Sequence, residues 1–211
     1  QLKAKSAQMK MATTAAGTEM TIAGAVSIDE DVTKSKTKLT MDMGTGQMEV
    51  RMVEGMMYLS MGEVTGNKFI KIDMTDPKDP LREQYGSLAD QADPEAQLKV
   101  FRDALVKFEN QGKDGGEIDG VETTRIAMVL DTSKVLKGKG EEVTKALSQM
   151  PKELEYVIYV GPDDLMRRMT MSFAKTDSTI DWANWGEPVE VKAPSKDQIT
   201  DASSLMGSFG G

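Results

Sequence analysis

Residues 39–74 read LTMDMGTGQMEVRMVEGMMYLSMGEVTGNKFIKIDM, and this stretch decides the fold because apolar residues alternate with polar ones along it. The dipeptide Glu54-Gly55 divides it in two and is typical of a two-residue hairpin loop. The pairs expected across that hairpin are Met52 with Met57, Val50 with Leu59, and Met48 with Met61. All six residues are apolar, so one face of the hairpin is expected to be covered.

Turn signals on either side of the hairpin add one strand at each edge. A turn at residues 44–47 and a loop at residues 62–67 both contain glycine. The further pairs expected on the same face are Met43 with Met48, Met41 with Val50, Leu39 with Met52, Ile70 with Met61, Ile72 with Leu59, and Met74 with Met57. Four antiparallel strands are therefore expected to share one apolar face.

Methionine is unusually common on this face. The chain has 17 Met among 211 residues. A dry β core is ordinarily built from Val, Ile and Phe, whose restricted rotamers specify the packing, whereas methionine adapts to variable shapes. The pattern alone fits two interpretations: a filled core that happens to use methionine, or a pliable apolar surface for a ligand.

Composition excludes most enzyme classes. The chain has no His and no Cys, which removes thiolate nucleophiles, the usual zinc ligands and the imidazole base. We therefore expect no catalytic residue, no metal site and no cofactor. The net charge of −8 argues against a nucleic acid partner, because phosphate binding requires clustered positive charge. No apolar run reaches the length of about 18 residues that a membrane-spanning helix requires.

The whole chain, residues 1–211, is expected to form one α+β domain. Residues 1–11 have the composition of a short helix or a tether, and a strand follows from Met20, in which Gly24 indicates a bend or a close approach. The sequence Ser195-Lys-Asp-Gln198 predicts a capping box and a closing helix that runs to about Leu205.

A helix is predicted in the middle of the chain. Asp93-Pro94-Glu95 supplies an N-cap, a proline at the first helical position and an early acid. The apolar stripe that follows at helical spacing is Leu98, Phe101, Leu105 and Phe108. This stripe needs a partner, and we expect it to cover the methionine-rich face of the sheet.

The C-terminal region carries the most specific resemblance. The sequence Trp185-Gly-Glu-Pro-Val-Glu-Val-Lys-Ala-Pro194, followed by Asp197-Gln198-Ile199-Thr200-Asp201, resembles the actinobacterial LppX/LprG-type envelope lipoproteins, as do the methionine-rich meander and the capped helix. Those proteins are similar in fold to the lipoprotein carriers LolA and LolB. The resemblance implies a strongly curved antiparallel sheet, a half-barrel, with helices closing its concave apolar side.

The same resemblance implies a function. It suggests a non-catalytic carrier of acylated lipids or lipoglycans, exported to the cell envelope and anchored to the outer face of the cytoplasmic membrane through a lipidated cysteine upstream of Gln1. A monomer is expected. The residues expected to line an apolar cavity are Leu39, Met41, Met43, Met48, Val50, Met52, Met57, Leu59, Met61, Ile70, Ile72, Leu98, Phe101, Leu105 and Phe108. The alternative is an envelope interaction or sensor module with a filled core and no lipid.

Overall fold

The computed structural model describes most of the chain, which divides into two units. The first unit comprises residues 1–12, 18–90 and 182–211, and the second comprises residues 13–17 and 91–181. The residues described are 4–15, 17–27, 29, 34–42, 46–76, 78–79, 81, 94–136, 151–174 and 176–200, with the backbone alone at 15 and 94–98.

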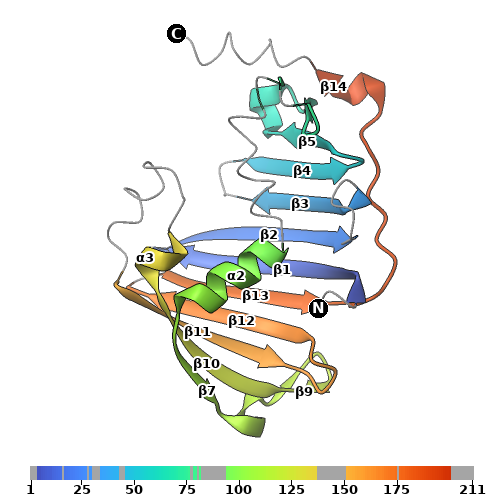
Figure 1. Cartoon of the computed structure of the whole chain (residues 1–211). Coiled ribbons are helices and arrows are strands. Elements are labelled where there is room, and N and C mark those ends of the chain that lie inside the picture. The colour runs from blue at the N-terminus through green and yellow to red at the C-terminus, as the bar shows by residue number, and fades with distance from the viewer. Residues whose placement is uncertain are drawn as a thin grey trace. The chain divides into compact units, whose positions relative to one another are not determined.

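The first unit contains seven strands in the order β14-β6-β5-β4-β3-β2-β1 (Figure 1). Neighbouring strands from β2 to β6 pair antiparallel, and the short β14 pairs parallel with β6. The bounds are β1 (Ser6–Ala15), β2 (Thr18–Ser27), β3 (Lys36–Asp42), β4 (Gln47–Val53), β5 (Met56–Ser60), β6 (Phe69–Asp73) and β14 (Ile199–Thr200). The predicted N-terminal helix or tether is wrong, because residues from Ser6 onward form β1.

The predicted central hairpin is confirmed. Met52 lies opposite Met57 and Val50 lies opposite Leu59. Glu54 and Gly55 form the loop, with φ values of 54° and 75°. Positive φ at both loop residues is what the twist of a two-residue hairpin requires. A register shift of one residue in either direction would place polar residues on the apolar face. The observed register therefore places Val50 and Leu59 together on that face.

The two flanking registers differ from the prediction by two residues. Leu39 lies opposite Val50, because Asp42 at the end of β3 pairs with Gln47 at the start of β4 and Met48 pairs with Met41. Ile70 lies opposite Leu59, because Met61 is already outside β5. There, Thr65 accepts a hydrogen bond from the Met61 amide at 3.1 Å and holds a short 3-10 turn, η3 (Gly62–Thr65). A shift of two residues changes partners but keeps every side chain on its predicted face.

The C-terminal segment crosses the opposite face of this sheet. Ser6 Oγ donates to the Glu187 carbonyl at 2.7 Å near the start of the segment, and Arg51 Nη1 donates to the Lys192 carbonyl at 3.2 Å farther along. The Arg51 guanidinium also lies 4.7 Å from the centre of the Phe69 ring. The predicted capping box forms around η5 (Lys196–Gln198), but the closing helix is wrong at positions 199–200, which pair with β6 as β14.

We expect replacement of Arg51 by alanine to lower the free energy of unfolding by about 1–2 kcal/mol, because it removes a cation–π contact and a hydrogen bond to the C-terminal segment. The Arg51→Lys variant is the matched control. It keeps the positive charge and removes only the planar guanidinium. Urea unfolding measures both. Equal stability of the alanine variant and the unsubstituted protein would show that the segment is held without Arg51.

The second unit contains a further run of strands, paired antiparallel, and two helices. Its strand order is β13-β12-β11-β10-β7 (Figure 1), and a separate two-stranded hairpin joins β8 to β9. The bounds are α2 (Pro94–Ala104), β7 (Leu105–Asn110), η4 (Gly112–Gly115), β8 (Glu117–Ile118), β9 (Val121–Glu122), β10 (Thr124–Asp131), α3 (Thr132–Val135), β11 (Glu153–Val160), β12 (Met166–Phe173) and β13 (Thr176–Ala183). The described residues thus form mainly antiparallel sheet with few helices.

The predicted helix in the middle of the chain is correct only in its first part. α2 ends at Ala104, and positions 105–110 form β7, which pairs with β10 so that Phe108 lies opposite Met128. This segment, LVKFEN, includes Val and Phe, which favour strands, and pairing with β10 overrides the helical spacing. Leu105 and Phe108 therefore do not extend the stripe of α2.

Candidate apolar ligand surface

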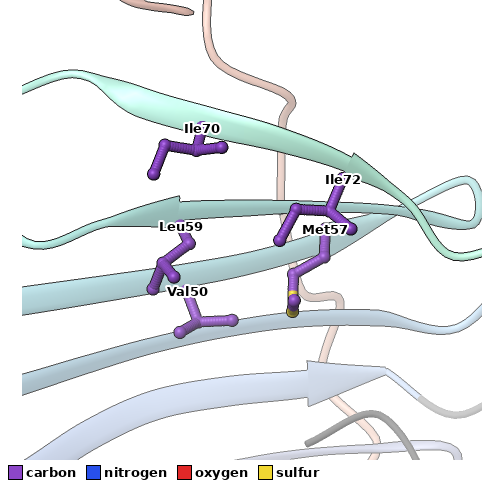
Figure 2. Packing of buried hydrophobic residues seen from close by; sticks show 5 residues of the cluster. All are labelled: Val50, Met57, Leu59, Ile70 and Ile72. Atoms are coloured by element: carbon purple, nitrogen blue, oxygen red, sulfur yellow. The ribbon is translucent and has the colours of Figure 1, made fainter. Parts of the chain in front are cut away.

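A cluster of buried side chains lies on the predicted apolar face of the first unit. Figure 2 shows Val50, Leu59 and Ile70 in one row across three neighbouring strands, and Met57 beside Ile72 in the next. The exposed fraction is 0% at Met57 and Ile72 and no more than 8% at the other three. This part of the face is a filled core, because the protein itself buries these five side chains almost completely.

Methionine surrounds this cluster. The residues that pack against it while remaining partly exposed are Met41, Met48, Met52, Met61, Met74 and Leu81. Met41 and Met48 lie directly opposite each other on β3 and β4. We call Met41, Met48, Met52 and Met61 the methionine rim. The rim offers flexible, polarisable side chains of the kind that adapt to apolar groups of variable shape.

The remaining predicted lining residues are distributed over the chain. Leu39 is half-buried and lies opposite both Gly24 and Val50 in the first unit. Met43 and the side chain of Leu98 are outside the described residues. Phe101 belongs to the second unit, where its ring meets that of Tyr156 edge-on at 5.8 Å. Leu105 and Phe108, also in the second unit, are 39% and 55% exposed.

The second unit has an apolar face that the predicted lining set omits. Tyr156 lies between Met128 on β10 and Met171 on β12, and Ile158 lies opposite both Ile126 and Met169. All of these residues are half-buried. Burial also raises the pKa of the Tyr156 hydroxyl. The alternation of Met169, Met171 and Phe173 in the sequence was the signal that could have added this face.

Strong charge pairs lie away from both apolar faces. Arg168 Nε donates to Asp181 at 2.5 Å, and this pair projects opposite to the neighbouring Met169 and Ile180. The hydrogen bond to Asp181 raises the pKa of the Arg168 guanidinium, and burial opposes this shift. Arg51 Nε donates to Glu49 at 2.6 Å on the face opposite Val50. The apolar faces can therefore receive an apolar group without burying these ion pairs.

The part of the chain that the structure describes shows neither a metal site nor a membrane-spanning helix. In those residues, no three His, Cys, Asp or Glu side chains gather as a metal site would require. None of the helices described there has the length and apolarity to cross a membrane.

Two solved structures resemble this one over nearly the whole chain. LprF from Mycobacterium bovis is 15% identical in sequence and has a TM-score of 0.59, and the match covers 90% of each of the two chains. The Mycobacterium tuberculosis lipoprotein LppX is also 15% identical, with a TM-score of 0.58 over 90% of this chain and 93% of LppX. The chain has the LprF and LppX fold. The predicted resemblance to LppX/LprG-type proteins is confirmed.

At 15% identity, the likeness to LprF and LppX is evidence about the fold and leaves the ligand open. No protein family matches the sequence. No curated protein matches it either.

Proposed function

We propose that this protein binds the acyl chains of a lipid or lipoglycan on its methionine rim and carries them, without catalysis, within the cell envelope. The partly exposed methionines of the rim carry this proposal, because they form an apolar surface beside a core that is already filled. Small-molecule sites are mostly apolar, and flexible methionine suits acyl chains of different lengths. The LprF and LppX fold supports the same assignment.

The proposal extends to the placement of the protein. As one carrier domain, it would be attached to the outer face of the cytoplasmic membrane by a lipidated cysteine preceding Gln1, and helices would close the apolar side over the ligand. The resemblance to envelope lipoproteins supports both features. LppX, whose fold this chain shares, is itself a lipoprotein.

The buried cluster favours a second candidate function. Because Met57, Leu59, Ile70 and Ile72 are 0–2% exposed, the face could serve as an ordinary core of an envelope interaction module. Solvent extraction of the purified protein followed by mass spectrometry separates the two. Acylated lipid in about equimolar amount supports the carrier. Protein that yields no lipid and takes none up from labelled vesicles leaves the interaction module.

A charge on the methionine rim should block lipid binding. We expect Met48→Glu to reduce the uptake of a fluorescent diacylglycerolipid about tenfold or more, because a carboxylate cannot be buried against acyl chains without a large desolvation cost. Met48 is half-buried, so the new carboxylate can still reach water and the fold should persist.

Gln47→Glu is the matched control for Met48→Glu. It adds the same negative charge one residue earlier on β4, where the side chain is exposed and projects to the other face. Uptake and circular dichroism are measured on both variants. Equal uptake by both, with the fold intact, would show that the methionine rim is not the ligand surface.

A further inference from the structure

Exposed apolar side chains gather at one edge of the second unit. Among the described residues, the large apolar side chains with the greatest exposure are Val64, Val100, Leu105, Val106 and Phe108. Four of these lie between positions 100 and 108, and three of the four lie on β7. Val106 and Phe108 are 54% and 55% exposed. This concentration is unusual for a surface that meets only water.

β7 is also a strand edge. It is the last strand in the order of its sheet, and all six of its residues are exposed. Among the described residues it pairs with β10 alone, so none of them pairs with the backbone donors and acceptors on its other side. An exposed edge of this kind is a template for pairing with another strand.

Two charges of opposite sign flank Phe108 on this edge. Lys107 and Glu109 project to the face opposite Phe108, with side chains that are 67% and 51% exposed. Their charged atoms lie 3.2 Å apart. The residues opposite them on β10, Val129 and Ala127, are uncharged. The edge therefore presents a positive, an aromatic and a negative side chain at three consecutive positions, 107 to 109.

This pattern is complementary to itself. In a symmetric antiparallel pair, the twofold axis passes midway between one residue and the same residue of the other copy, which lie opposite each other. An axis at Lys107 or at Glu109 would place like charges opposite each other, which is unfavourable. An axis at Phe108 pairs the two rings and places Lys107 of each copy opposite Glu109 of the other. Only that register matches both charges and aromatic residues.

We propose that two copies of this chain associate through β7, antiparallel, with Phe108 on the twofold axis. Residues 107–109 of each copy would form the centre of the pairing, and Val106 beside them has no partner on β10, because the register between β7 and β10 shifts there. The interface joins the β7 edges of two copies and uses no residue of the methionine rim. This inference stands independently of the lipid-carrier proposal.

Charge exchange tests the register directly. Lys107→Glu and Glu109→Lys each place like charges opposite each other in the pair, so either variant alone should weaken dimerisation about tenfold or more. Mixing the two variants restores two opposite-charge pairs in a heterodimer. Analytical ultracentrifugation, at concentrations up to about 1 mM, measures each variant and the mixture. Recovery in the mixture requires contact between two chains, so the ion pair within one chain cannot explain it.

Lys192→Glu is the matched control. Lys192 is exposed and pairs with Glu190 at 3.2 Å, with the same separation in sequence as Lys107 and Glu109, but it lies in the C-terminal segment. Its replacement should leave the association unchanged. The sequence predicts a monomer, and an unsubstituted protein that remains monomeric over the whole concentration range would overturn the proposal. So would a dimer that neither charge variant weakens.

Discussion

Replacing Met57 with alanine should lower the free energy of unfolding by about 2–5 kcal/mol, because the change removes a buried side chain and leaves a cavity. Met57 is 0% exposed and packs in the buried cluster. Its cross-strand neighbours on the same face are Met52 and Ile72, which come from β4 and β6. Three strands meet around this one side chain, so the cavity cannot close without shifting two sheet registers.

Met56 provides a matched control for Met57. It is the same residue type on the same strand, but it is only half-buried and projects to the opposite face. We expect Met56→Ala to cost clearly less than Met57→Ala in urea unfolding. If the two substitutions cost the same, the buried cluster would not be the part of the first unit that holds the sheet together.

The sequence predicted the faces of the first sheet better than it predicted the partners. Alternation assigns Val50, Leu59 and Ile70 to one face, and any register error of two residues preserves that assignment. The partners depend on where each loop begins. Thr65, whose hydroxyl caps the Met61 amide, removes Met61 from β5, and no periodicity in the chain signals such a side-chain bond.

Competition between helix and strand explains the main error in the second unit. Leu105 and Phe108 continue the helical spacing of Phe101, so the sequence predicts one long stripe. Pairing with β10 supplies hydrogen bonds and a cross-strand contact to Met128 that an isolated helical turn does not have. Such tertiary pairing routinely overrides local spacing. Leu105 and Phe108 are therefore exposed on β7 and do not belong to the candidate ligand surface.

The C-terminal segment shows why local sequence signals alone do not predict where a helix ends. Its capping box was predicted from Ser195 and Gln198 and is present, yet the chain continues as β14. The deciding partner is Phe69, which lies opposite Ile199 although it is far away in sequence. Local signals describe how a helical turn begins, whereas a distant sheet edge decides whether the turn continues.

Gly24 illustrates a sequence signal with a direct structural cause. The predicted close approach is confirmed, because Gly24 lies opposite Leu39 on β3. A Cβ added at Gly24 would lie 2.7 Å from Leu39 Cδ2 and closer still to the Lys38 carbonyl oxygen. The leucine side chain could rotate away. The carbonyl belongs to the β2–β3 pair and cannot move without disturbing that pairing.

We therefore expect Gly24→Ala to destabilise the protein by about 1–3 kcal/mol, the usual cost of overpacking. The sign is informative, because in an ordinary strand the same substitution stabilises by about 0.5–1 kcal/mol through a lower entropy of the unfolded chain. Gly46→Ala is the control, since an added Cβ there meets no atom within 4 Å. It should change the free energy of unfolding by no more than about 0.5 kcal/mol. Urea unfolding measures both, and a Gly24→Ala variant as stable as the Gly46→Ala variant would mean that β2 and β3 have room to separate at this point. In that case Leu39 would be free to move, and the half-buried part of the apolar face around it would accommodate an added methyl group without loss of stability.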